Sequence, residues 1–351
     1  MSRSQGNDMP LFKFLVAASA ALALMALARV PAEAAEPTLA LVKKRGELLC
    51  GVNGQLPGFS AMNDKKELAG FEVEFCHAVA AATLGDANRV KLVPLTARLR
   101  FDALRSGQID VLARNTTITL ARTAKTGVRD AAVFYIDGQA VAVPKKLGLS
   151  SAVQIAGRTV CTLNGTPYAA DLEDWLDYRK FSFKPMMLDT QKEMYEAFFA
   201  GKCDAVTQDI SAITTTIVAA DKGLDYMVLP EIIAKHPLAA HVRTGDDQWF
   251  DVVRWTLFAM LEAEERGITQ ANVETQRQTG SRAVKRLLGV PPGNGNVLGL
   301  DDDWAFNIIK QVGNYSEVYE RNLGQYSAWK FPRSVNALWT NGGVLHPLPF
   351  R

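Results

Sequence analysis

The sequence predicts an α/β fold of two lobes, with the second lobe inserted into the first. Apolar runs of strand length alternate with helix-length segments from residue 48 to about residue 229, which predicts parallel sheets covered by helices on both faces. After residue 243 the chain continues in long helical segments without another strand–helix repeat. The simplest path that agrees with both observations leaves the first lobe near residues 135–137 and returns to it near residues 237–239.

The composition is that of a globular protein. Of the 351 residues, 48% are hydrophobic and 22% are charged, and the formal net charge is +2. This length suffices for two domains of ordinary size. Because the basic residues are scattered rather than clustered, we expect no nucleic-acid partner.

The first residues are typical of an export signal. Arg3 and Lys13 precede an apolar run over residues 15–27, and small residues including Ala34 and Ala35 follow. A short apolar core between basic residues and an A-x-A site predicts a cleavable secretory signal, since the run is short for a membrane span. We therefore assign residues 1–35 to a signal peptide; an uncleaved anchor is the alternative.

The first lobe begins with two strand–helix units. Strands are predicted over residues 48–52 and 90–94, and helices over a segment ending at about Leu84 and over residues 98–106. The loop at residues 53–59 follows the first strand. Ligands of parallel sheets bind at the carboxyl ends of the strands, so this loop, which begins with Asn53, is predicted to line a cleft.

The stretch over residues 109–122 carries the strongest indication of a site. It opens with an apolar run, continues with Asn115 and Thr117, and leads into a helix with Arg122 in its first turn. A buried strand would deliver these side chains to the cleft, and a guanidinium group suits a carboxylate. Alternatively, the stretch is a strand-to-helix connection with a cap, and Arg122 is a solvated surface residue.

The second lobe repeats the alternation. Its predicted elements are strands at residues 139–143, 158–163, 183–188 and 203–209 and helices at residues 151–156, 168–178 and 191–200, and residues 225–229 close the lobe. The turn with Gly165 and Thr166 can point backbone N–H groups at an anion, or Thr166 can simply cap the following helix. Asp209 ends a strand, where it either caps a helix or faces an ammonium group.

The order of these elements predicts the domain boundaries. The first part of lobe 1 covers residues 36–136, and lobe 2 covers residues 137–237. Residues 238–351 form the return of lobe 1 and a C-terminal helical extension, with helices predicted at 249–265 and 272–288. Two paired crossovers between lobes would act as a hinge around a cleft.

All four cysteines, Cys50, Cys76, Cys161 and Cys203, lie in the part of the chain that would be exported. An even number in an oxidising compartment favours disulfides, and four cysteines allow three pairings. Cys50 and Cys76 fall in the first strand–helix unit and the other two in a later block, so we predict bonds 50–76 and 161–203. A metal site is the competing interpretation, but the spacings are long and uneven.

The chain resembles the periplasmic solute-binding proteins of the polar amino acid type (bacterial extracellular solute-binding proteins, family 3), and within them the general L-amino-acid-binding branch. These are receptors of ATP-binding-cassette importers. The matching segments are LCGVNG at residues 49–54, RNTT at 114–117 with Arg122, GKCDA at 201–205, VRWTLFAM at 253–260 and IKQVGNY at 309–315. The resemblance extends from about residue 45 to the C-terminus, across both lobes.

This resemblance implies a type II periplasmic binding-protein fold and a role for each candidate site residue. Arg122 would bind the ligand α-carboxylate, assisted by Thr117 and the turn of Gly165 and Thr166. Asp209 and Asn115, beside Asn53, would hold the α-ammonium. It also implies a periplasmic monomer without cofactor or metal, whose partners are free L-amino acids and the permease subunits of an inner-membrane importer.

Three positions depart from related single-amino-acid receptors. Asn53 stands where they tend to have an acid, and Leu56 where they tend to have an aromatic residue. Pro167 has no N–H, so one backbone donor to the carboxylate is missing. With Leu56 and the small Ala97 beside the cleft, few groups would select the ligand side chain, so we expect a broad range of polar and aliphatic L-amino acids.

An enzyme is the alternative, because exported dehydratases of cyclohexadienyl or arogenate type resemble the same fold. Such an enzyme needs an acid or base beside the reacting group. None of the histidines falls in a predicted cleft loop; they are His77, His236, His241 and His346. Asp209 is the remaining acidic candidate, and the receptor interpretation already uses it.

Overall fold

The computed structural model describes Met1 and residues 36–350. The predicted signal segment, apart from Met1, lies outside the described residues. The elements below belong to the compact unit formed by residues 37–351. Among the described residues, no helix is long and apolar enough to cross a membrane.

A nine-stranded mixed sheet runs through this unit, in the order β5-β1-β6-β12-β7-β10-β8-β9, with β11 paired to β7. The pairs of β1 with β5 and β6, and of β8 with β9 and β10, are parallel as predicted. The pairs that involve β7 or β12 are antiparallel. The α/β class with two lobes is confirmed, but the expectation of parallel pairing fails in both lobes wherever a strand pairs with β7 or β12.

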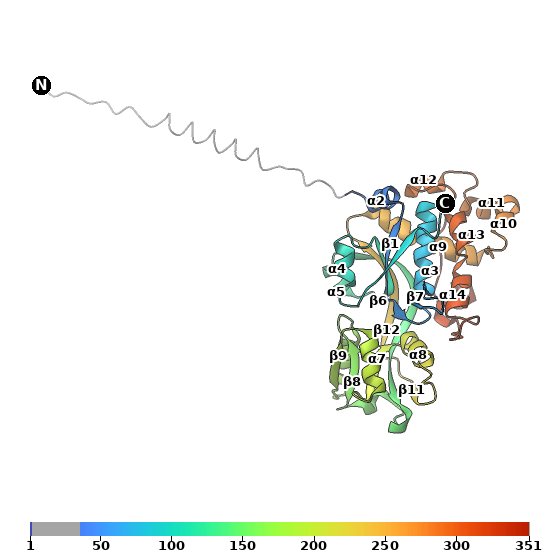
Figure 1. Ribbon diagram of the computed structural model, residues 1–351. Helices are drawn as coiled ribbons and strands as arrows, with labels where there is room; N and C mark the ends of the chain where they lie inside the picture. The colour runs from blue at the N-terminus through green and yellow to red at the C-terminus, as the bar shows by residue number, and fades with distance from the viewer. Residues whose placement is uncertain (2–35, 351) are drawn as a thin grey trace. The chain divides into compact units, whose positions relative to one another are not determined.

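Two long strands connect the lobes (Figure 1). β7 covers Val128–Pro144 and β12 covers Ala234–Arg243. Their pairing is antiparallel from Arg243 opposite Val128 to Ala234 opposite Gln139, with two register shifts near the predicted crossovers. Beyond Gln139, β7 pairs with strands of the second lobe. The prediction of a strand only from residue 139 was therefore too short, because the backbone hydrogen bonds to β12 extend β7 through residues 128–138, where Asp137 and Gly138 interrupt the apolar pattern.

In the first lobe, predicted and observed elements agree closely. Its elements are α2 (Thr38–Arg45), β1 (Leu48–Val52), a small sheet of β2 (Gln55–Leu56), β3 (Ser60–Met62) and β4 (Leu68–Ala69), α3 (Phe71–Leu84), β5 (Val90–Pro94), α4 (Arg100–Arg105), β6 (Val111–Thr117) and α5 (Leu120–Lys125). β6 lies between β1 and β12 and is buried along its whole length. This position explains its apolar start and forces its polar end into the molecule.

In the second lobe, helices cover both faces of the sheet. Its elements are the 3₁₀ turns Lys145–Leu147 and Ala152–Ile155, β8 (Thr159–Leu163), α6 (Tyr168–Asp177), β9 (Lys184–Leu188), α7 (Gln191–Phe199), β10 (Ala205–Asp209), α8 (Ile210–Ala219) and β11 (Tyr226–Val228). Successive residues of a strand point to opposite faces. Accordingly, Ala140 and Ala142 pack with α7 and α8, while Val141 and Val143 pack with α6.

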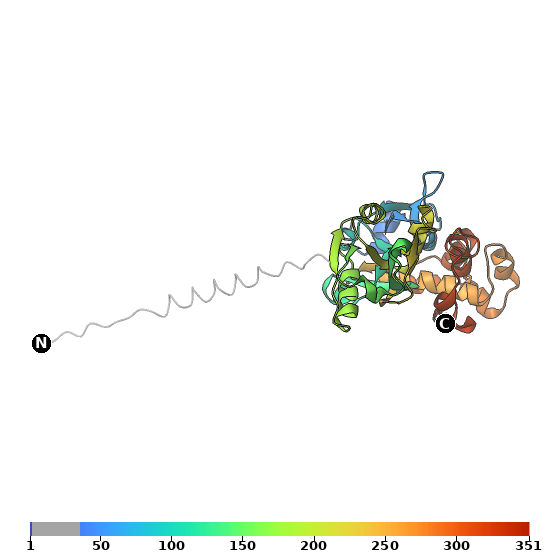
Figure 2. The ribbon, with the colours of Figure 1, turned by 90° about the horizontal axis from the view of Figure 1, so that it is seen from below.

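The C-terminal helices pack beside the first lobe (orange to red in Figure 2). They are α9 (Asp247–Glu265), α10 (Val273–Thr279), α11 (Arg282–Leu287), α12 (Asn294–Leu298), α13 (Trp304–Gln311) and α14 (Tyr315–Asn322), followed by 3₁₀ turns at Ser334–Asn336 and Trp339–Asn341. The single helix predicted over residues 272–288 is wrong. Gly280 is extended and Ser281 accepts a hydrogen bond from the Val284 N–H, so a new helix begins there.

Both predicted disulfides are present, Cys50–Cys76 and Cys161–Cys203. Each joins a strand to the helical side of its own lobe: Cys50 lies in β1 and Cys76 in α3, while Cys161 lies in β8 and Cys203 just before β10. The pairing prediction is confirmed, because grouping the cysteines by the first strand–helix unit and the later block placed the correct partners together.

Candidate ligand-binding site

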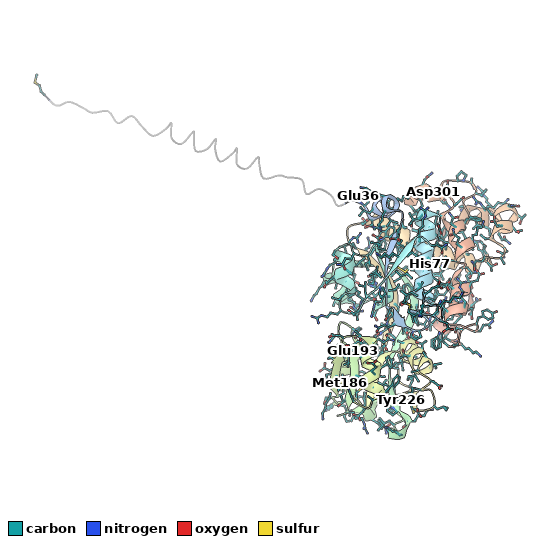
Figure 3. All side chains as sticks on the ribbon, in the orientation of Figure 1. Glu36, His77, Met186, Glu193, Tyr226 and Asp301 are labelled. Atoms are coloured by element: carbon teal, nitrogen blue, oxygen red, sulfur yellow. A yellow bond between two sulfur atoms is a disulfide. The ribbon has the colours of Figure 1, made fainter. Side chains whose placement is uncertain are left out.

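A cavity of about 160 Å³ lies where loops of the two lobes meet. The first lobe contributes Asn53, Gln55 and Arg114 to its lining, and the second lobe contributes Leu163 and Gln191. Gln191 begins α7, whose first turn holds Glu193, labelled in Figure 3. Drug-sized ligands need roughly 300–1,000 Å³, so this volume suits a smaller solute.

Hydrogen bonds link three of the predicted residues from one lobe to the other. The Asn53 amide donates to Asn115 Oδ1 over 2.9 Å, and the Asn115 amide donates to Asp209 Oδ2 over 3.4 Å. All three side chains are buried. The loop after β1, the end of β6 and the end of β10 thus meet, as expected for the carboxyl ends of parallel strands.

Asp209 lies before α8, but its side chain caps none of the helix N–H groups. The carboxylate instead accepts from the Tyr168 hydroxyl over 2.8 Å and contacts His236 Nδ1 at 2.6 Å. The other ring nitrogen of His236 lies 3.1 Å from Asp171. The capping alternative for Asp209 is therefore wrong, and a network of buried donors surrounds its carboxylate.

The charge of His236 follows from these contacts. Burial lowers the pKa of His236, but the hydrogen bonds to Asp171 and Asp209 outweigh it and raise the pKa to about 9. His236 is therefore protonated, as the imidazolium, at neutral pH. Its ring also stacks on Tyr168, with 5.4 Å between ring centroids. Both ring nitrogens of His236 are thus engaged with carboxylates.

Arg122 is buried in the first turn of α5, where Thr119 caps the helix by accepting from the Arg122 N–H. Its guanidinium donates to the Thr117 carbonyl over 2.7 Å and, across the lobes, to the Gly165 carbonyl over 3.2 Å. The solvated-surface alternative for Arg122 is therefore wrong. Burial lowers the pKa of Arg122, while Tyr168 and Asp209 act in the opposite direction.

In the Gly165–Thr166 turn, the first residue contacts the other lobe and the second bonds within its own loop. Gly165 touches the first lobe through its carbonyl, which also accepts from Arg100 over 3.1 Å. The Thr166 hydroxyl donates to the Leu163 carbonyl over 2.6 Å, within its own loop, and makes no cap for α6. Capping by Thr166 is therefore wrong, because Pro167 occupies the N-cap position.

Gly165 is needed for the close approach of the lobes. Its φ is +74°, and an added Cβ would lie 3.1 Å from the Ala97 carbonyl oxygen. We expect Gly165→Ala to lose about 1–2 kcal/mol from backbone strain and, in addition, about tenfold or more in ligand affinity, because the methyl group keeps the lobes apart. Thermal unfolding and calorimetry measure the two effects.

Gly157→Ala is the matched control for this variant. Gly157 has a φ of +73°, but nothing lies within 4 Å of an added Cβ. The control should therefore lose stability without losing affinity. Equal affinities for the two variants would show that the contact between Gly165 and Ala97 does not govern ligand binding.

The structure adds residues to the site that sequence reasoning missed, namely Arg100, Arg114, Tyr168 and His236. His236 was set aside because it lies outside the cleft loops, yet it reaches Asp209 from the connecting strand β12. Arg114 directly precedes Asn115 in β6 and opens the matching segment RNTT, and its place in that segment could have identified it. Leu56, expected beside the cleft, is instead buried in the first-lobe core.

Glu72, in the first turn of α3, is a buried acid behind the loop that holds Asn53. A carboxyl oxygen of Glu72 accepts from the Ser60 hydroxyl over 3.0 Å, and the hydroxyl oxygen of Ser60 accepts from the Asn53 N–H over 3.0 Å. Burial raises the pKa of Glu72 to about 8. Glu72 is thus an uncharged support for this loop at neutral pH.

Known proteins are similar to this chain in sequence, and one of them also in structure. The chain is 43% identical to the general L-amino acid-binding periplasmic protein AapJ of Rhizobium johnstonii, in a match that covers 95% of this chain and 98% of AapJ. It is 42% identical to the glutamate/glutamine/aspartate/asparagine-binding protein BztA of Rhodobacter capsulatus, and this match covers 95% of this chain and 99% of BztA. A periplasmic binding protein from Brucella ovis with glutathione bound is 44% identical, with a TM-score of 0.87 over 90% of this chain and all of that one.

The match to the family itself covers most of the chain, including both lobes and the C-terminal helices α9 to α14. Residues 48–325 match the bacterial extracellular solute-binding proteins, family 3. The chain therefore belongs to family 3 of the bacterial extracellular solute-binding proteins.

Proposed function

We propose that this protein is a periplasmic receptor that binds L-amino acids between its lobes and delivers them to an inner-membrane ATP-binding-cassette importer. The observation that carries this proposal is the presence of buried Arg122 and buried Asp209 where the two lobes meet. A guanidinium group suits an α-carboxylate and a carboxylate suits an α-ammonium. A free amino acid carries both groups whatever its side chain.

The names of the relatives support the same ligand class. AapJ is named for general L-amino acids, BztA for glutamate, glutamine, aspartate and asparagine, and the Brucella protein holds glutathione. These relatives are binding proteins, and no observation favours a dehydratase. We propose that the receptor acts as a monomer, is exported by its first 35 residues, and takes several polar and aliphatic L-amino acids.

The two lobes would close around the ligand. β7 and β12 are continuous between the lobes, and the donors to the Gly165 carbonyl and the contact of Gln191 with the Gln55 carbonyl join the lobes over 3.1–3.3 Å. We place the lobe boundaries near residues 136 and 237 on these strands. A ligand held by both lobes favours the closed state, whose surface a permease could recognise.

A thermal-shift panel tests this function. The chain without residues 1–35 is heated with each of the twenty L-amino acids, and D-enantiomers serve as controls. A ligand at 100 times its dissociation constant stabilises the folded state by about 2.7 kcal/mol, so several L-amino acids should raise the melting temperature. Stabilisation by none of them would refute the receptor proposal, and stabilisation by one alone would refute the broad range. Turnover of a prephenate-like substrate would favour the enzyme instead.

A further inference from the structure

Arg114 is a buried cation in the lining of the inter-lobe cavity. It lies in β6, and only 5% of its surface is exposed. Its Nε donates to the Leu95 carbonyl over 3.1 Å, and none of the ion pairs among residues 36–350 includes it. A buried guanidinium group without a carboxylate partner destabilises the folded protein. An anionic group of a ligand that binds beside it would therefore supply the missing charge partner.

The neighbouring charges leave this cation uncompensated. Burial lowers the pKa of Arg114, and Arg122 lowers it further, whereas Glu72, Tyr168 and Asp209 raise it. Glu72 is uncharged at neutral pH, since burial raises its pKa to about 8. Among these neighbours, the carboxylate of Asp209 shares its negative charge with the His236 imidazolium 2.6 Å away, so it is not a partner of Arg114 alone.

Two further groups belong to this charge balance. Arg100 is fully buried and donates to the carbonyls of Ala97 and Gly165, so it adds positive charge on the same side. Asp189 also lines the cavity, but it is exposed and accepts from the Asn164 amide over 2.9 Å. Water and salt screen an exposed carboxylate far more than a buried guanidinium. The cavity wall is therefore electropositive.

The position of Arg114 separates it from the groups assigned to the ligand's α-carbon. Asn53 lines the cavity together with Arg114 and donates to Asn115, which donates to Asp209. Arg122 and Asp209 suffice for the α-carboxylate and α-ammonium. Arg114 is thus a third charged group, in a place where the ligand side chain would extend into the cavity.

We propose that Arg114 is a specificity-determining residue that binds a second acidic group of the ligand, so that the receptor prefers acidic L-amino acids over their uncharged amides. This inference rests on the proposed function, since it uses Arg122 and Asp209 as the anchors of the α-groups. A charged hydrogen bond contributes more than a neutral one. L-glutamate and L-glutamine have nearly the same shape, so they isolate this contact.

The experiment measures the dissociation constants of L-glutamate and L-glutamine by calorimetry, for the mature chain and for Arg114→Gln. In the wild type, glutamate should bind about tenfold or more tightly than glutamine, the difference between charged and neutral hydrogen bonds. In Arg114→Gln the ratio should fall to about one, through weaker glutamate binding, because the α-anchors common to both ligands remain. Arg89→Gln, which makes the same change at an exposed site, should keep the wild-type ratio.

If Arg114→Gln does not fold, the affinities of Arg114→Lys and of the wild type still test the role of Arg114. Arg114→Lys retains the charge and should keep glutamate ahead of glutamine. Equal affinities in the wild type, or an unchanged ratio in Arg114→Gln, would overturn the role of Arg114 while leaving the receptor function intact. Binding of neither amino acid, nor of any other in the panel, would instead overturn the receptor function and this inference with it.

Discussion

Replacing Arg122 with alanine should abolish detectable amino-acid binding while leaving a folded protein. Arg122 is buried beside the cleft and reaches Gly165 of the opposite lobe. Truncating one partner of a buried, hydrogen-bonded charge pair costs roughly 2–5 kcal/mol, and each 1.4 kcal/mol is about tenfold in affinity. A micromolar ligand would then bind at a concentration near millimolar or weaker. Calorimetry measures the affinity, and thermal unfolding reports whether the fold is retained.

Lys125→Ala is the control for this variant. Lys125 lies in the same helix α5 and carries the same charge, but it is exposed. The control should keep wild-type affinity, so that a loss in Arg122→Ala is assigned to the position rather than to net charge. An Arg122→Ala protein with wild-type affinity would remove this residue from the ligand site.

The second large effect is expected for His236→Phe, which keeps an aromatic ring against Tyr168 but removes both nitrogens. Asp209 is fully buried and would lose its closest partner, at 2.6 Å. Breaking a buried charge pair by removing one member costs roughly 3–5 kcal/mol of stability. Chemical denaturation should therefore show a large loss in the variant at neutral pH.

The pH dependence of stability gives this variant a specific signature. The pKa of His236 is about 9 in the folded protein against an ordinary value of 6.5. A raised histidine pKa contributes stability that is fully present below pH 6.5 and is lost as the pH rises through 9. Burial also raises the pKa of Glu72 to about 8 and of Asp137 to about 7. These two acids likewise lower the stability of the protein as the pH rises, but their effect is largely complete by about pH 8.

The interval from pH 8 to pH 9 therefore separates His236 from these two acids. The wild type should still lose stability across it, whereas His236→Phe should lose clearly less. His77→Phe is the control, because His77 is half-buried and its Nδ1 contacts a backbone carbonyl, that of Ala87, rather than a carboxylate. Parallel pH profiles for the wild type and His236→Phe would contradict the assigned charge of His236.

Much of the fold could be predicted because its elements are encoded locally. The apolar run that ends in Asn115 and Thr117 is the buried strand β6, and the residues after it form the capped helix α5. The disulfides could be paired because Cys50 and Cys76 belong to the first strand–helix unit and Cys161 and Cys203 to one later block of the second lobe. By contrast, the break at Gly280 was missed, because glycine is tolerated inside a helical pattern and only the cap at Ser281 reveals the second helix.

The sequence alone determined the α/β class, the two lobes, the disulfides and the loops that carry Asn53, Asn115, Arg122 and Asp209, since these follow from local pattern and chain order. Only the tertiary structure decided which groups surround those side chains. Tyr168 and His236 reach Asp209 from positions 41 and 27 residues away, and Arg114 enters the cavity wall through the packing of β6 against its neighbours. Such contacts depend on strand register and on how closely the lobes approach, and neither can be predicted from a short segment of the chain alone.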